Sequence, residues 1–159
     1  MSRRRTTLAA AVAFVAIALP ANASGFPSPL PAKVTARGHT VNAEIGSYCV
    51  DSSKGNAGMC ADKIFARPGR RHRLAVAPGM RMTFEFRDNP QLNDDVTDAA
   101  ASLVRFHKDG RAEDVGELDL ADAGDLWSLE LPKRLHRANA INVFSSLDGG
   151  GDILSLIHI

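Results

Sequence analysis

The sequence predicts an all-β protein, a single antiparallel Ig-like β-sandwich of about seven strands with one disulfide at a hairpin tip. Three observations predict this fold. Apolar and polar residues alternate along several short segments, Gly-rich and Asp-Gly turns separate these segments, and two cysteines flank a turn-like loop. The chain has 159 residues, which is enough for one domain with a modest core.

Residues 1–23, MSRRRTTLAAAVAFVAIALPANA, have the pattern of a signal peptide. Arg3–Arg5 form a positive segment, Leu8–Leu19 an apolar segment and Ala21–Ala23 a small-residue cleavage site. The apolar run is shorter than the roughly 20 residues that span a bilayer, so cleavage after Ala23 is favoured over an uncleaved anchor. The arginines leave the twin-arginine export route open beside the general one. We therefore expect an extracytoplasmic protein, secreted or held in the cell envelope.

Residues 24–32, SGFPSPLPA, are rich in proline, which favours extended backbone. We expect this segment to be a lead-in outside the core, with the sandwich domain spanning residues 33–153.

Alternation with period two predicts the inward face of each strand. Residues 140–152, AINVFSSLDGGGD, predict a further strand that runs into a Gly-rich turn. Residues 94–103, DDVTDAAASL, predict a short helix instead, capped by Asp94 or Asp95. The expected inward residues are, in chain order, Val41, Ala43 and Ile45; Met80, Met82, Phe84 and Phe86; Val104 and Phe106; and Trp127, Leu129 and Leu131.

The last six residues, LSLIHI, resemble the translation of a transposon end used in preparing sequencing libraries. This resemblance predicts that residues 154–159 are a foreign tail on a chain truncated near Ile153. The alternative is an ordinary final strand. On either interpretation, His158 is excluded from the candidate site residues.

Cys49 and Cys60 are the two cysteines of the chain. In an exported protein an even cysteine count indicates a disulfide, and the residues between these two have the composition of a turn. A redox site would have C-x-x-C at the start of a helix, and the sequence has no such motif. A zinc site needs two further ligands at fixed spacing, and His39 and His72 form no such pattern. We therefore expect a structural disulfide.

The segments GSYCV, residues 46–50, and CAD, residues 60–62, resemble the marker motif of a family of small bacterial extracytoplasmic β-sandwich proteins of undefined activity. That motif is GSYCW, a short loop, then C(A/V)DY. Val50 replaces the motif's Trp, Lys63 replaces its Tyr, and the loop of this chain is longer. The resemblance implies the same disulfide and a sandwich, and it implies no activity.

Two basic clusters, ARPGRRHR at residues 66–73 and PKRLHR at residues 132–137, lie in expected loops. If they meet in space, they would contact anionic wall polymers or lipid head groups. Tyr48 falls on the phase opposite Val41, Ala43 and Ile45, either laid over the disulfide or sheet edge or exposed for recognition. The predicted binding surface comprises Tyr48, Asp51, Asp62, Arg70, Arg71 and Arg73.

We predict no catalytic residue, no cofactor and no metal ligand. Met80 and Met82, with Met59 and His72 nearby in sequence, have the soft ligands that copper prefers, but they continue the inward face of a strand. The acidic segments at residues 89–98 and 117–125 lack the spacing of a calcium loop, so we expect solvated loops there.

The charge of the exported chain disfavours nucleic acid as a partner. Without Arg3–Arg5, 16 basic residues stand against 18 acidic ones, a net charge near −2. The sequence therefore favours an exported binding or structural module whose partner is an envelope polymer or another secreted protein. The alternative is a small metal-binding protein or hydrolase with a site built across loops.

Overall fold

The computed structural model describes residues 26–54, 57–63, 67–93, 95–124 and 126–159. The predicted signal peptide lies outside these ranges. Within them the chain forms twelve strands, one three-residue 3-10 helix and no α-helix. The elements are β1 (Lys33–Ala36), β2 (His39–Asn42), β3 (Glu44–Ser52), β4 (Gly58–Ala61), η1 (Arg70–His72), β5 (Arg81–Glu85), β6 (Leu92–Asn93), β7 (Val96–Phe106), β8 (Ala112–Leu118), β9 (Leu120–Asp122), β10 (Trp127–Glu130), β11 (Ala140–Leu147) and β12 (Asp152–His158).

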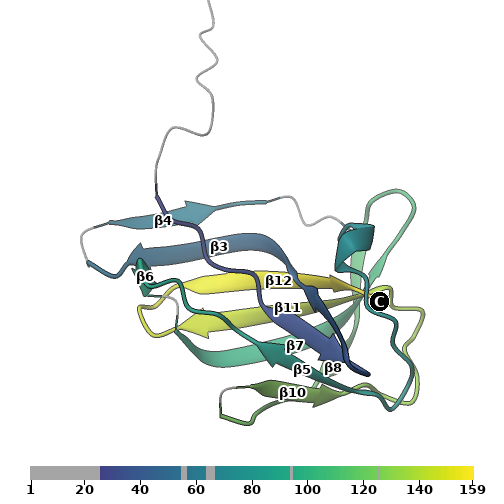
Figure 1. Cartoon of the computed structure of the whole chain (residues 1–159). Coiled ribbons are helices and arrows are strands. Elements are labelled where there is room, and N and C mark those ends of the chain that lie inside the picture. Colours follow the sequence, from purple (N-terminus) through teal and green to yellow (C-terminus); the bar gives the residue numbers. More distant parts are fainter. Residues whose placement is uncertain (1–25, 55–56, 64–66, 94, 125) are drawn as a thin grey trace, which may run out of the picture.

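The strands form two antiparallel sheets that pack face to face (Figure 1). One sheet has the order β2-β1-β5-β10-β9, and the other has the order β4-β3-β12-β11-β7-β8, with β6 paired to the end of β3. The predicted all-β antiparallel sandwich with one disulfide is confirmed. The expected number of about seven strands is wrong. HTVNAEI divides into β2 and β3, and short strands such as β6 and β9, of two and three residues, have no alternation that marks them in the sequence.

The main core lies between the sheets, where alternate residues of facing strands meet. Met82 and Phe84 of β5 are fully buried, and Leu129 of β10 is 2% exposed. Ile141 and Ile157 pack against them from the other sheet. The alternation in MRMTFEF and WSLELP therefore predicted the inward faces correctly, and core packing rather than copper explains Met80 and Met82.

The chain changes sheets at Ala43, inside the segment HTVNAEI that was expected to be one strand. Ala43 is buried between β2 and β3, and its N–H donates to the Ala32 carbonyl at 2.8 Å. A bulge follows, since Tyr48 pairs with Ile153 but Ile45 pairs with Ser155. A bulge inserts an extra residue and reverses the alternation beyond it. The expected outward phase of Tyr48 is therefore wrong, and its side chain lies inside.

Residues 96–106, the larger part of which was expected to be helical, form the long strand β7. β7 pairs with β11 on one side and β8 on the other. The alanine-rich segment Ala99–Ala101 has a high helix propensity, but pairing on both edges satisfies its backbone groups and overrides that preference. Asp94, one of the two predicted helix caps, lies outside the described residues.

Residues 26–32 of the lead-in and the last six residues both belong to the folded domain. Ala32 is 3% exposed in the main core, and Phe26 packs against a second cluster around Tyr48. β12 is the central strand between β3 and β11, and Leu156, Ile157 and His158 are all buried. Residues 154–158 thus form a strand that is covered on both faces.

Cys49 and Cys60 are joined across the β3–β4 hairpin. They form a cross-strand pair within the hairpin rather than at the strand ends, because β3 continues to Ser52 and β4 begins at Gly58. The β11–β12 turn passes close to this hairpin at Gly151, where a Cβ atom would lie 2.2 Å from the Cys49 carbonyl oxygen. Only glycine fits this approach.

Candidate functional site

The predicted binding surface does not form one surface in the structure. Tyr48 is 7% exposed, and its hydroxyl group lies 3.4 Å from Ser28 Oγ. Asp51 is exposed near the end of β3, and Asp62 is exposed directly after β4. The arginines of the predicted surface lie elsewhere, on and beside η1. Tyr48 is therefore not exposed for recognition, whereas the three arginines are exposed at the surface.

η1 is anchored to the end of β12 and to β2. Arg73 forms a bridge with His158, and the Leu74 N–H donates to the His158 carbonyl at 2.8 Å. His72 Nδ1 donates to the Asn42 carbonyl at 2.6 Å, and Arg71 Nε donates to His72 Nε2 at 2.8 Å. These contacts hold a three-residue turn in place, so its arginine side chains project from a fixed backbone.

The arginines at η1 lack carboxylate partners among the described residues. Arg70, Arg71 and Arg73 are exposed, and the described ion pairs include none of them. Glu44, the nearby acid, accepts from the Gly69 N–H at 3.0 Å and lies 3.8 Å from His72. The positive charge of this region also acts on His158. Burial, followed by the charges of Arg67, Arg73 and Arg70, lowers the pKa of the His158 ring.

The second basic cluster lies at the same end of the sandwich. Ile159, which follows β12, donates its N–H to the Asn139 carbonyl at 3.1 Å, and Ala140 pairs with His158. Residues 132–139 therefore flank the end of β12, as η1 does. We call this surface the basic end. Its exposed cationic residues are Arg67, Arg70, Arg71, Arg73, Lys108, Arg111, Lys133, Arg134 and Arg137.

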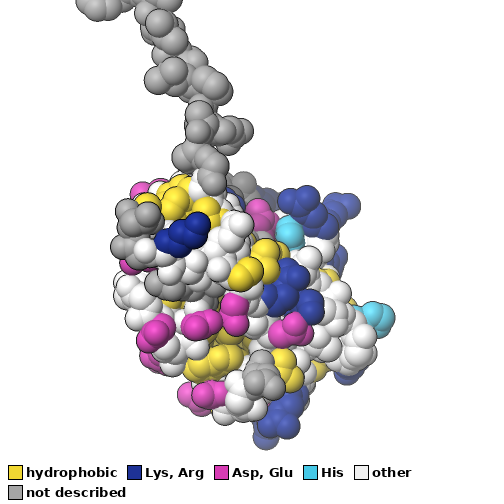
Figure 2. Space-filling model, turned by 60° about the vertical axis from the view of Figure 1, so that its left-hand side comes forward, with side chains coloured by type: hydrophobic (Ala, Val, Ile, Leu, Met, Phe, Trp, Pro, Cys, Tyr) yellow, Lys and Arg dark blue, Asp and Glu magenta, His cyan; other side chains and the backbone are white. Residues whose placement is uncertain are grey.

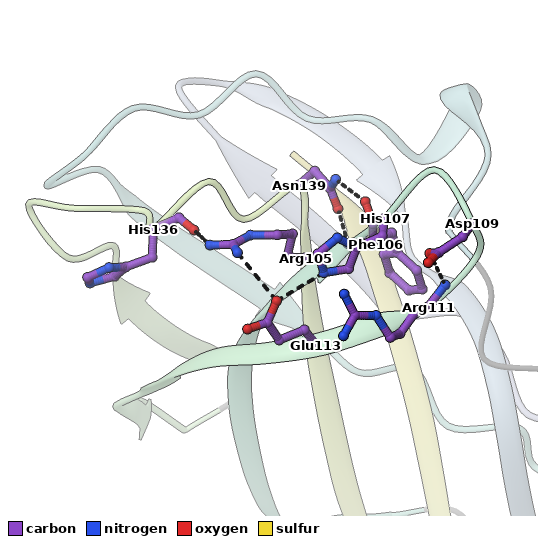
Figure 3. A network of polar contacts seen from close by, with 8 residues as sticks. All are labelled: Arg105, Phe106, His107, Asp109, Arg111, Glu113, His136 and Asn139. Carbon is purple, nitrogen blue, oxygen red and sulfur yellow. Dashed lines mark hydrogen bonds and ion pairs between the residues drawn. The ribbon is translucent and has the colours of Figure 1, made fainter.

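A polar network orders two loops of the basic end (Figure 3). Glu113 accepts from His107 at 3.0 Å and from Arg105 at 3.3 Å, and Arg105 also donates to the His136 carbonyl. The Asn139 side chain accepts from the Phe106 N–H at 2.9 Å and donates to the Phe106 carbonyl at 3.0 Å. The network ties the 107–111 hairpin to residues 132–139.

The charge on Glu113 is stabilised by this network. The hydrogen bond from His107, followed by the positive charges of Arg105, His107 and Arg111, lowers the pKa of Glu113. The His107–Glu113 pair is partly exposed, at 27% and 45% of the two side chains, and it lies on a hairpin. Its contacts indicate a structural role in positioning the loops.

An open cavity of about 570 Å³ lies at the opposite end of the sandwich. Asp95, at the mouth of this cavity, is joined to the β11–β12 turn, because the Asp148 N–H donates to its carbonyl at 3.0 Å. β12 runs from this turn to η1, a distance of about 20 Å for a strand of its length. The residues that line the cavity are Glu85, Phe86, Asp88, Asp95, Val96, Gly124, Leu126 and Trp127.

The cavity combines carboxylates with an aromatic wall. Phe86 and Trp127 meet edge to face, with ring centroids 6.4 Å apart. Asp88 and Asp95 both contribute exposed carboxyl groups to the lining. Loss of hydration, followed by the negative charge and a hydrogen-bond contribution of Asp95, raises the pKa of Asp88. Figure 2 faces this end, where acidic side chains lie beside hydrophobic ones and most basic side chains lie towards the right and lower edges.

The sequence does not predict this cavity. Its acidic residues come from two separate segments, residues 85–88 and Asp95, and its two aromatic residues are expected only as inward strand positions. The signal available in the sequence was indirect. Leu126 adds an apolar residue on the phase opposite to the inward residue Trp127, and in the structure Leu126 is 39% exposed. Across the described part of the chain, no three His, Cys, Asp or Glu side chains are grouped to hold a metal ion.

Comparisons with known proteins find no family model, no curated protein and no solved structure that matches the chain. No helix within the described ranges has the length and apolar character needed to cross a membrane.

Proposed function

We propose that this protein is an exported binding module whose basic end attaches to an anionic polymer of the cell envelope. The observation that carries the proposal is the set of exposed arginines on η1 that have no carboxylate partner among the described residues. A concentration of unpaired positive charge attracts polyanions and speeds their association. Export and the Ig-like character of the sandwich are part of this proposal, and the pattern of residues 1–23 and the GSYCV…CAD resemblance support them.

The loops of the basic end are held in place, which favours binding because fewer side chains and loops lose freedom when a ligand arrives. His136 and Arg137 have φ angles of 46° and 59°, in the left-handed region that non-glycine residues rarely adopt. Such strained residues cluster at functional sites, where the surrounding structure maintains them. Here the bond from Arg105 to the His136 carbonyl helps to maintain them.

A polymer is favoured over a lipid surface because no described residue of the basic end has an exposed large apolar side chain. The exposed large hydrophobic residues within the described ranges are Leu30, Leu126 and Phe144, and all three lie outside the basic end. Segments that lie in a membrane interface combine basic residues with Trp, Phe or Leu. The basic end has the first feature without the second.

The proposal is tested by measuring the affinity of the purified exported protein for long-chain inorganic polyphosphate. We expect binding that weakens at least tenfold between about 50 and 200 mM salt, because bound phosphates release counterions. Arg70→Glu should weaken binding at low salt at least fivefold. Lys54→Glu, the same charge reversal on the β3–β4 hairpin, should change it less than twofold. Equal affinity of both variants would overturn the proposal, and binding only to vesicles of anionic phospholipid would replace the polymer with a membrane.

The alternative of a hydrolase has one observation in its favour, the carboxyl pair Asp88–Asp95 in a cavity. Glycosidases place their two carboxyl groups about 5 Å or more apart, so that a sugar bond fits between them. Asp88 and Asp95 both line the open cavity, and Asp95 raises the pKa of Asp88. Two carboxyl groups coupled in this way are what a hydrolase would use, so hydrolysis is the second candidate function.

A further inference from the structure

The cavity at the end opposite η1 contains negative charge that the described part of the protein does not neutralise. Glu85 is paired with Lys33, since Lys33 Nζ lies 2.7 Å from Glu85 Oε1. Asp88 and Asp95 have no such partner among the described residues, and both line the same cavity. The charge of Asp95 raises the pKa of Asp88, and a cation placed between the two carboxyl groups would offset this repulsion.

The wall beside the carboxyl pair is aromatic and apolar. Trp127 and Phe86 line the cavity, and Leu126 exposes 39% of its surface there. Trp is the aromatic residue that attracts a cation most strongly to its face. An ion that keeps a full water shell gains little from such a wall, whereas a weakly hydrated organic cation gains from both the carboxylates and the ring.

We propose that this cavity binds a guanidinium or alkylammonium group between the Asp88–Asp95 carboxyl pair and the Trp127 wall. A guanidinium group is planar and donates two parallel hydrogen bonds to carboxylate oxygens. The cavity volume of about 570 Å³ accommodates such a group together with the chain that carries it. The site is separate from the basic end, so the failure of either proposal leaves the other standing.

Two sources would supply the same chemistry. One is a separate molecule that carries the cationic group. The other is a second copy of this chain. η1, which carries exposed arginines, lies at one end of the sandwich, and the β11–β12 turn, to which the cavity residue Asp95 is bonded, lies at the other (Figure 1). Docking of η1 from one copy into the cavity of the next is a head-to-tail contact, which is not self-complementary and extends into chains.

The binding test uses agmatine, which carries one guanidinium and one ammonium group, and follows it by calorimetry. The wild-type protein should bind agmatine and should not bind 1-butanol, an uncharged control. Asp88→Asn with Asp95→Asn should weaken agmatine binding at least tenfold, because the cation loses both carboxylates, and Asp62→Asn should leave it within twofold. The amide variants keep the shape of the cavity, so they fold. Agmatine binding that survives in the double variant would overturn the proposal.

A second measurement identifies the source by sedimentation velocity at low salt. If a second copy is the occupant, the wild-type protein forms chains, whereas Arg70→Glu alone and Asp88→Lys alone are monomers. A mixture of the two variants then stops at dimers, since the Asp88→Lys copy keeps its arginine and the Arg70→Glu copy keeps its cavity. A monomeric wild-type protein that binds agmatine assigns the site to a separate molecule. Absence of both self-association and agmatine binding would overturn the proposal.

Discussion

Asp88, in the lining of the cavity, is a residue whose negative charge destabilises the folded protein. Loss of hydration and the negative charge of Asp95 both disfavour the charged form of the Asp88 carboxyl group and raise its pKa. The folded state therefore holds the Asp88 proton more tightly than the unfolded chain does. The destabilising contribution is absent below the ordinary pKa of 3.8 and grows as the pH rises through the raised pKa.

We predict that Asp88→Asn stabilises the protein at pH 7 by roughly 0.2–1 kcal/mol, the range for exposed charge pairs. The gain should disappear well below pH 3.8, where the carboxyl group is protonated in both states. Urea denaturation at the two pH values measures this difference. Asp62→Asn, which removes a charge elsewhere, serves as the control. A loss of stability at pH 7 would show that Asp88 makes favourable contacts instead.

At this scale the sequence predicted core residues better than surface residues. Met82, Phe84 and Leu129 followed from alternation alone, because burial depends on a local period of two. The grouping of Asp88 and Asp95 with Trp127 around one cavity did not, because the pairing of strands far apart in the sequence brings these residues together. The expected outward phase of Tyr48 was wrong for a related reason. The alternation of inward and outward residues does not continue through a change of sheet or a bulge.

Among the elements, the β3–β4 hairpin has the clearest link between sequence and stability. The bond between Cys49 and Cys60 joins neighbouring strands, with a sequence separation of 11. A cross-link of this kind stabilises the fold mainly by restricting the unfolded chain. Cysteine spacing and turn composition were sufficient to predict it.

We predict that Cys49→Ser with Cys60→Ser lowers the free energy of unfolding by about 3 kcal/mol. Denaturation of the wild-type protein with and without reductant should show the same loss, and reductant should not affect the double variant. Mass spectrometry of the protein without reductant should detect no free thiol. Two free thiols would contradict the disulfide.

The strand β12 was the least predictable element. Its last residues resemble the translation of a transposon end, and both of its faces carry apolar residues. In the structure it lies in the centre of the larger sheet and pairs with β3 and β11. Ile157 is fully buried in the main core, whereas Leu154 is only partly buried on the other face. The segment therefore contributes to folding whatever its origin.

We predict that Ile157→Ala destabilises the protein by about 2–5 kcal/mol, because it leaves a cavity in the core. Leu154→Ala should cost less, since Leu154 keeps contact with solvent. Thermal unfolding of the two variants measures the difference. If residues 154–159 were an unstructured tail, neither substitution would change the unfolding temperature.

The whole molecule separates its charges although its total charge is small. Exposed arginines and lysines from η1, the 107–111 hairpin and residues 132–139 gather at one end, and the carboxylate cavity lies at the other. The composition of the chain, with a net charge of +1, conceals this separation. The sequence did not establish that the two basic clusters meet. They lie at the same end because β12 pairs with β11 and because the end of β12 also contacts Arg73, beside η1.

The most direct test of the account is an NMR titration of the isotopically labelled protein with inorganic polyphosphate. We predict that backbone shifts change around residues 70–73, 107–111 and 132–139, while the residues that line the carboxylate cavity stay unchanged. The changes should reverse when salt is added, because the interaction is electrostatic. Shifts concentrated at the cavity, or no shifts at all, would contradict the claim that the basic end is the binding surface.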